Sequence, residues 1–223
     1  MRKKDFDIID INCGCPAYKV VRIGAGSELM KNPEHIGKIV KTLSLKIKKP
    51  ITIKIRLGIN DKKINALEVA KIAEKNGASA ITIHGRTQKQ GYSGKADWKL
   101  IKKIKETLKI PVIGNGDITT PEEFVEKLKY SNVDAIMIGR GAIGNPYIFK
   151  QINDHRKTGK YDDKGKKEQF KEYLVLAIKY NVEFNQIKFH AISLLFSSNF
   201  AVQYNPLFLI TLAWFEVDVE ITQ

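Results

Sequence analysis

Five short apolar runs divide this sequence at regular intervals, and their residue alternation limits the possible folds more than any other feature. The runs are Ile8–Asn12, Ile51–Arg56, Ala80–His84, Pro111–Gly114 and Asp134–Gly139. In the first three, apolar and polar residues alternate with the period of two that is typical of β-strands. Amphipathic stretches with helical spacing separate all five. This succession of strand and helix predicts an α/β fold with a parallel sheet and right-handed crossovers.

Local signals mark the ends of the expected helices. Asn32, followed by Pro33 and Glu34, predicts one helix start. Asp97 is a second candidate N-cap, and Thr120-Pro121 combines a capping residue with proline at the first helical position. Gly77 closes the helix that begins near Ala66, since glycine adopts the left-handed conformation found just after helix ends.

The polar parity of the first three strands predicts a functional face. Its members are Asp10, Asn12, Thr52, Lys54, Arg56, Thr82 and His84. The apolar parity packs against helices, so these polar side chains point into an interior and gather at the strands' carboxyl ends. That end is the active-site face of a β/α barrel and the ligand crevice of an open α/β sheet. No GxGxxG sequence follows the first strand, which argues against a dinucleotide site.

The last two strands end in glycine-bracketed polar groups. These are "GNGD" at Gly114–Asp117 and "GRG" at Gly139–Gly141. Glycine lets backbone N–H groups approach a ligand closely, and helix starts follow both loops. Each loop alone is compatible with a tight turn that needs glycine only for geometry. Two in succession, one of them carrying an arginine, favour a phosphate site.

Charge and cysteine content limit the partners and the cellular location that we expect for this chain. The 223 residues include 38 Lys and Arg against 24 Asp and Glu, a formal net charge of +14. This excess suits a polyanionic partner, with nucleic acid as the first candidate, or a lysine-rich surface of the hyperthermophile type. The two cysteines, Cys13 and Cys15, are too few for a zinc site and too close for a structural disulfide. With no signal-peptide or membrane-length apolar stretch, we expect a cytoplasmic protein without a membrane or metal partner.

The segment "DINCGCP" (Asp10–Pro16) places both thiols directly after the first strand. Metal ligation, a disulfide, a nucleophile, an acid and simple packing are the possible roles. A free thiol is mostly protonated at neutral pH and can act as a general acid. Burial as a small apolar side chain is the alternative for Cys15 and the preferred interpretation for Cys13.

Five motifs in order resemble those of the tRNA-dihydrouridine synthases, flavoproteins that reduce uridine in tRNA. They are "DINCGCP", "ITIKIRLG", "ITIHGRTQKQGYSGKADW", "VIGNGDI" and "IMIGRGAIGNPYIF", and the match covers about residues 5 to 152. The resemblance implies a TIM-type (β/α) barrel, represented by about its last five strand–helix units over residues 1–155. A helical RNA-binding-like segment with an atypical tail after Phe196 is expected over residues 156–223. Three further units precede these in the family, so we expect a need for a partner or for the missing N-terminal segment.

The resemblance also implies a reaction and a set of residues. Reduced FMN would give a hydride to C6 of uracil and Cys15 a proton to C5, with NADPH as the electron donor and tRNA as the partner. Cofactor-binding positions are Lys54, His84, Asn115, Gly116, Asp117, Gly139 and Arg140. Lys54 would stabilise the anionic reduced ring. Asp117, itself an anion, is expected to bind a ribityl hydroxyl or to orient the loop.

Substrate contacts are expected from Asn12, Arg86 and Tyr92. Asn12 would orient the uracil, although capping of a turn is the alternative. Arg86 and Tyr92 lie in a basic loop, Arg86–Trp98, which we predict to be flexible and to close over the target base. Two other functions stay open: a dihydroorotate dehydrogenase-like flavoprotein and a non-catalytic, truncated RNA-binding remnant.

Overall fold

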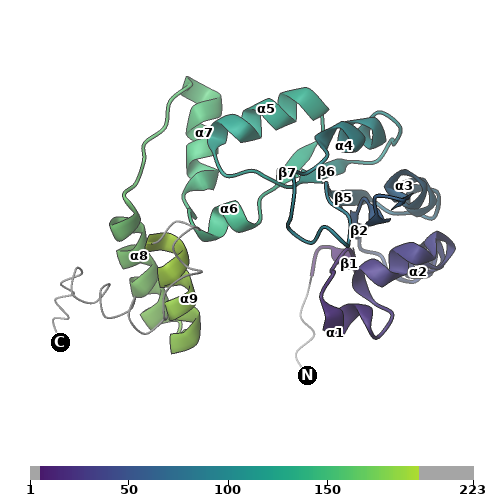
Figure 1. The fold of residues 1–223 in the computed structure, drawn as a ribbon, viewed down its shortest axis with the longest axis horizontal. Coiled ribbons are helices and arrows are strands. Elements are labelled where there is room, and N and C mark those ends of the chain that lie inside the picture. The colour runs from purple at the N-terminus through teal and green to yellow at the C-terminus, as the bar shows by residue number, and fades with distance from the viewer. Residues whose placement is uncertain (1–5, 196–223) are drawn as a thin grey trace. The chain divides into compact units, whose positions relative to one another are not determined.

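Five strands form one parallel sheet whose spatial order follows the sequence (Figure 1). The computed structural model describes residues 6–195. The strands are β1 (Ile9–Cys13), β2 (Ile51–Arg56), β5 (Ala80–His84), β6 (Val112–Asn115) and β7 (Ala135–Met137). A doubly wound sheet would reverse its strand order at a switch point. Sequential parallel order instead is the arrangement of consecutive units of a β/α barrel, and the predicted fold class is confirmed.

The sheet separates an apolar side from a polar side, as the residue alternation predicts. Ile53, Ile55, Ile81 and Ile83 are fully buried in the core on the apolar side. Helices α2 (Pro33–Lys46), α3 (Ala66–Lys75) and α4 (Trp98–Lys105) cover this side (Figure 1). On the polar side, the register places Asn12 beside Lys54, and His84 between Arg56 and Asn115. Polar groups from four neighbouring strands therefore share one face.

The predicted helix starts at Asn32 and Asp97 are confirmed by side-chain contacts. The Asn32 carboxamide oxygen accepts from the His35 N–H at 3.0 Å, and an Asp97 carboxylate oxygen accepts from the Leu100 N–H at 2.9 Å. Gly77 follows α3 with φ of +97°, the left-handed conformation expected after a helix end. Helix α5 (Pro121–Ser131) begins at its proline.

Four short elements have no clear signal in the sequence. A short antiparallel hairpin, β3 (Gly58–Asn60) and β4 (Lys63–Ile64), follows β2. A one-turn helix α1 (Tyr18–Val21) and a 3-10 helix η1 (Gly26–Lys31) follow the Cys15 segment. Strands of two or three residues are too short for a periodic pattern to develop, because periodicity needs several residues to be visible.

The chain divides into two compact units, which part between Ile138 and Gly139. The domain boundary at residue 155 stays a prediction. The first unit comprises the sheet and its helices up to Ile138, without the short segment Thr119–Glu122. The second unit contains that segment and the helices α6 (Arg140–Ile143), α7 (Ile148–Thr158), α8 (Lys166–Lys179) and α9 (Phe184–Leu195). The predicted atypical tail lies outside the described residues. Among the described helices, none has the length and apolar character needed to cross a membrane.

Candidate functional site

A rigid turn at the end of β1 presents Cys15. The Asn12 carboxamide oxygen accepts hydrogen bonds from the N–H groups of Gly14 and Cys15, at 3.1 and 2.9 Å. The Cys15 carbonyl accepts from both the N–H and the hydroxyl of Ser27, at 3.0 and 2.9 Å. The backbone is thus held on both sides of Cys15. Asn12 has the turn-capping role that the sequence left open, and its contact with uracil stays a prediction.

The two cysteines occupy different environments. Cys13 is fully buried in the core, and burial raises the pKa of its thiol to about 12. Cys15 is partly exposed. Gly26 packs against it so closely that a Cβ at position 26 would lie 2.6 Å from the Cys15 carbonyl oxygen. Cys13 therefore serves packing, and Cys15 is the thiol that a ligand or reagent can reach.

Lys54 and Asn115 meet across the polar face of the sheet. The Lys54 ammonium donates to the Asn115 carboxamide oxygen at 3.3 Å, although β5 lies between their strands. The Asn115 Nδ2 group donates to the Met137 carbonyl at 2.8 Å, which fixes the orientation of the amide. Burial, and then the neighbouring charge of Arg56, lowers the pKa of Lys54. A half-buried cation in this position favours an anionic neighbour.

His84 lies between them on β5 and is 8% exposed. Burial lowers its pKa to about 3, and the charges of Arg56, Lys54 and Arg86 add to this effect. The imidazole is therefore neutral at physiological pH. It can donate or accept a hydrogen bond, but it does not supply a positive charge.

The lowered pKa of His84 predicts a loss of stability in mild acid. The folded pKa of about 3 lies below the usual value of about 6.5, so the unfolded state binds the additional proton between these pH values. Stability is complete above the upper value and falls as pH decreases through this window. Between pH 7 and pH 5, we expect His84→Gln to lose about 1 kcal/mol less than the wild type in urea unfolding. An equal effect from His35→Gln, at an exposed histidine, would contradict this assignment.

Arg56 is a candidate functional residue that was not among the predicted site residues. Its side chain is 3% exposed. The Nε group donates to the Gly14 carbonyl at 2.9 Å, and Nη1 donates to the carbonyls of Thr87 and Gly91 at 2.8 and 2.9 Å. Arg56 lies two residues after Lys54 on the same parity at the end of β2, and that placement was the available signal.

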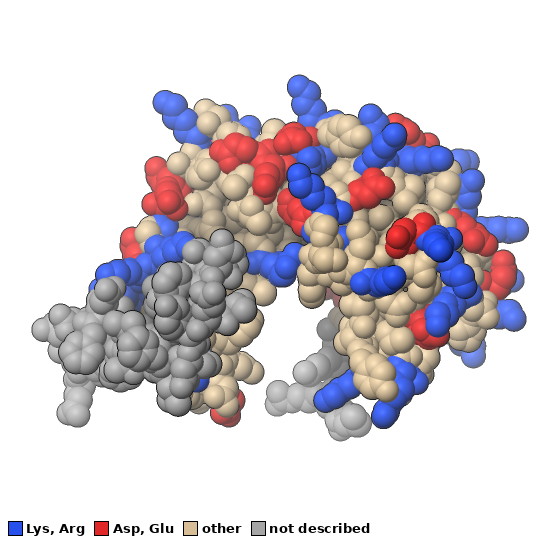
Figure 2. All heavy atoms as spheres, in the orientation of Figure 1, with Lys and Arg blue, Asp and Glu red and all other residues tan. Residues whose placement is uncertain are grey.

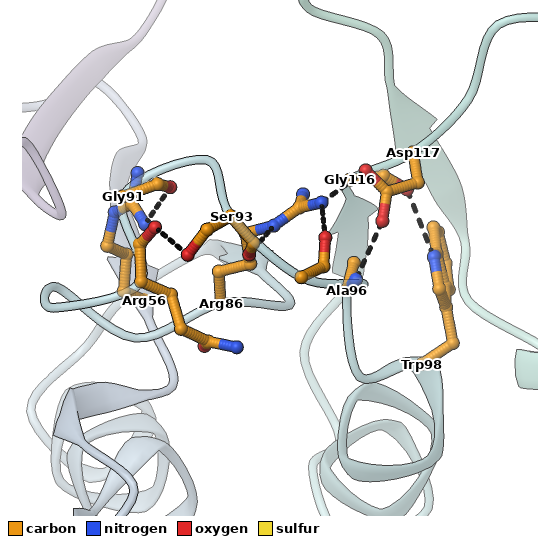
Figure 3. A network of polar contacts seen from close by, with 10 residues as sticks. Arg56, Arg86, Gly91, Ser93, Ala96, Trp98, Gly116 and Asp117 are labelled. Carbon is orange, nitrogen blue, oxygen red and sulfur yellow. Dashed lines mark hydrogen bonds and ion pairs between the residues drawn. The ribbon is translucent and has the colours of Figure 1, made fainter.

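The buried Arg86 forms an ion pair with the partly exposed Asp117 (Figure 3). Arg86 is 3% exposed, and its guanidinium donates to Asp117 at 2.7 Å and to the carbonyls of Ser93 and Gly94. Asp117 also accepts from the Ala96 N–H at 2.7 Å. Of the two roles expected for Asp117, these contacts support orientation of the loop. Binding of RNA by Arg86 stays a prediction, and the observed contacts favour a loop-holding role for it.

The loop from Arg86 to Trp98 is more constrained than the predicted flexible lid. Besides the two arginines, the Gln90 side chain accepts from the Thr87 N–H at 2.7 Å, and the Trp98 indole donates to the Gly116 carbonyl at 3.0 Å. Tyr92, at the loop's tip, is 61% exposed, and its ring centroid lies 6.0 Å from the Arg56 guanidinium carbon. The structure thus holds the loop by many contacts and leaves its aromatic side chain accessible.

Gly116 permits close approach between this loop and the end of β6. Its φ is +132°, and a Cβ there would lie 2.6 Å from the Ala96 side chain. Gly139 and Arg140, the other predicted phosphate-binding positions, belong to the second compact unit, where Arg140 begins α6. Their association with the Gly114–Asp117 loop stays a prediction.

The polar face carries an excess of positive charge. Three cations, Lys54, Arg56 and Arg86, lower the pKa of His84. Two carboxylates among the described residues oppose them: Asp117, which is paired with Arg86, and Asp10, which acts on Lys54. Lys and Arg are otherwise spread over the visible surface with Asp and Glu among them (Figure 2). No group of three or more His, Cys, Asp or Glu within residues 6–195 could hold a metal ion. The positive charge of this face suits an anionic ligand.

Comparison with known proteins gives consistent matches. The family model described as dihydrouridine synthase (Dus) matches residues 1–204. A probable tRNA-dihydrouridine synthase of Rickettsia bellii is 49% identical over 152 residues, which cover 68% of this chain and 47% of that protein. The tRNA-dihydrouridine synthase B of Pasteurella multocida is 49% identical over 144 residues, covering 65% and 43%. The chain spans about half the length of the curated relatives it matches.

Proposed function

Because this chain belongs to the dihydrouridine synthase family, we propose that it takes part in the FMN-dependent reduction of the uridine 5,6 double bond in tRNA. One arrangement carries the proposal: the partly exposed Cys15 follows β1 by two residues, and Lys54 on β2 lies in register with Asn12, whose side chain holds the Cys15 turn. Reduction of the double bond needs a hydride and a proton. FMN, when bound and reduced, supplies the hydride.

Cys15 supplies the proton. Its thiol donates to C5 of the uracil as C6 receives the hydride, and the resulting thiolate is reprotonated from solvent. The turn around Cys15 holds the sulfur at a defined place, because Asn12 and Ser27 fix the backbone on both sides. General acid catalysis of this kind depends on such positioning.

Lys54, His84 and Asn115 would hold the flavin ring. The Lys54 ammonium offsets negative charge that develops on the reduced ring, and Asn115 orients that ammonium. The neutral imidazole of His84 can hydrogen-bond without adding charge. For the phosphate, we propose the glycine-bearing loop around Gly116 in the first compact unit. Gly139 and Arg140, in the second unit, stay predicted phosphate-binding positions. We further propose NADPH as the electron donor and a cytoplasmic location, in line with the family.

The β3–β4 hairpin and the loop from Arg86 to Trp98 would contact RNA phosphates. Backbone hydrogen bonds of 2.9 Å join them, from Gln88 N–H to the Gly58 carbonyl and from Lys89 N–H to the Ile59 carbonyl. Exposed lysines lie on both segments: Lys62, Lys63, Lys89 and Lys95. Because the segments are joined beside the Cys15 turn, their ammonium groups are suited to guide a polyanion toward the thiol.

Alanine at these four lysines should weaken tRNA binding and reduce its salt dependence. Each phosphate contact that is lost makes the slope of log K against log salt shallower by roughly 0.7 to 0.9, so the four changes together reduce it by up to about 3. Filter-binding or polarisation titrations at several salt concentrations measure this slope. The matched control replaces four exposed lysines of α2 and α3, namely Lys38, Lys41, Lys71 and Lys75. An equal reduction in the control would contradict a localised RNA surface.

A direct assay tests the proposed function. The purified chain is incubated with FMN, NADPH and an unmodified tRNA transcript, and nucleosides are analysed by mass spectrometry. We expect a flavin absorption spectrum and a gain of two mass units on uridine. A flavin-containing protein that converts dihydroorotate but not tRNA would instead support the dihydroorotate dehydrogenase-like alternative. A protein that binds RNA without binding flavin would support the non-catalytic remnant.

A further inference from the structure

We infer that Arg56 is a positioning residue that ties the Cys15 turn to the loop bearing Tyr92, so that the two segments keep one mutual geometry. The inference concerns residues 12–15 and 86–94, both within the first compact unit. Its consequence for catalysis rests on the proposed function, whereas the tie itself does not.

The hydrogen bonds of Arg56 join two segments that are distant in sequence. Its guanidinium bonds the Gly14 carbonyl on one segment and the Thr87 and Gly91 carbonyls on the other, at 2.8 to 2.9 Å. Only arginine offers several donors in one rigid plane. A lysine at this position could keep the charge but could not reproduce these three contacts in the same geometry.

The two carbonyls that Arg56 joins, those of Gly14 and Gly91, each directly precede a residue with a proposed role in the reaction, Cys15 and Tyr92. The Gly14 carbonyl belongs to the peptide bond that leads into Cys15, and the Gly91 carbonyl to the one that leads into Tyr92. A shift of Gly14 therefore moves the thiol, and a shift of Gly91 moves the exposed ring. Arg56 thus sets the separation between a proton-donating group and an aromatic side chain that can contact a base.

Arg86 provides an internal comparison. It is equally buried and holds the same loop, but its partners are Ser93, Gly94 and Asp117. Within residues 6–195, these side-chain contacts join the loop to the end of β6, and none of them reaches the Cys15 turn. Loss of Arg86 should therefore loosen the loop without loosening residues 12–15.

Hydrogen–deuterium exchange of the full chain tests the tie without flavin or RNA. We expect Arg56→Met to raise exchange roughly tenfold or more in both segments, around Gly14 and Cys15 and over residues 87–94. Arg86→Met should raise exchange over residues 87–96 alone. Arg22→Met, which removes an exposed arginine, should change neither segment.

Two results would overturn the inference. Arg56→Met could raise exchange in residues 87–94 and leave the Cys15 turn protected, which would show that no tie exists. Alternatively, exchange could rise equally in strands β2 and β5, and Arg56 would then be only a core residue. Arg56→Lys supplies a second, milder variant, and we expect it to raise exchange in both segments as well.

A kinetic measurement separates positioning from binding once dihydrouridine formation is established in the wild type. We expect Arg56→Lys to lower kcat roughly tenfold or more while the KM for tRNA changes less than threefold. An unchanged kcat would contradict the positioning role. If the wild type itself forms no dihydrouridine, the proposed function fails, while the exchange experiment still decides whether the tie exists.

Discussion

Replacing Cys15 with alanine should lower the rate of the proposed dihydrouridine formation by a factor of about 100 or more and leave the proposed FMN binding in place. General acid catalysis contributes roughly 100- to 10,000-fold in rate, and alanine has no proton to donate. The substitution removes a partly exposed thiol, and the turn is held by backbone bonds to Asn12 and Ser27 that alanine preserves. Single-turnover reaction of reduced, FMN-loaded protein with excess tRNA measures the chemical step.

Cys13→Ala is the matched control. Cys13 lies in the core with no exposed surface, so its truncation should cost about 1 to 2 kcal/mol of stability. The turnover rate should stay within a few-fold of the wild type below the melting transition. A Cys15→Ala protein that retains most of its activity, or a Cys13→Ala protein that loses it, would remove Cys15 from its proposed role.

Lys54→Met should weaken binding of reduced FMN more than binding of oxidised FMN. The half-buried ammonium lies at the strand ends, and the negative charge that it would offset is present only after reduction. Hydrogen bonds to charged groups contribute about 1.5 to 3 kcal/mol, so we expect a differential loss of roughly tenfold or more. The midpoint potential of the bound flavin should fall by about 30 mV for each factor of ten.

Spectroelectrochemical titration of the FMN-loaded protein measures that potential. Lys38→Met, which removes an exposed lysine of α2, is the control and should leave the potential unchanged. If Lys54→Met weakens both oxidation states equally, Lys54 contributes to binding but not to stabilisation of the reduced ring. An unchanged affinity and potential would place the flavin elsewhere.

The strands and helix ends could be predicted because their signals are local. Strands β2 and β5 have the predicted bounds, since alternation over five or six residues defines both the strand and its buried face. Asn32 and Asp97 cap helices because their side-chain oxygens accept hydrogen bonds from N–H groups of the first helical turn, and residues of this type before a helix predict such a cap. The parity and the strand order also place Lys54, His84 and Asn115 on one face. The contact between Lys54 and Asn115 crosses β5 diagonally, two residues out of register, and could not be predicted from these signals.

The roles of Arg56 and Arg86 could not be predicted in the same way. Their partners are mostly backbone carbonyls, and every residue has one, so no residue type marks them in the sequence. The bond from Arg56 to Gly14 also spans 42 positions along the chain. The loop was predicted to be flexible because a basic loop beside a flavin could hold RNA and close over the target base. Its actual constraint depends on these two buried cations and on Asp117, which only the folded chain brings together.

The central claim is that the flavin site and the Cys15 thiol share the polar face of the sheet. Alkylation of Cys15 by iodoacetamide, followed by mass spectrometry at increasing FMN concentrations, tests it most directly, with buried Cys13 as the internal control. The account predicts that FMN slows alkylation of Cys15 several-fold, with the same saturation as the flavin absorbance change. Saturable FMN binding that leaves the Cys15 rate unchanged would contradict it.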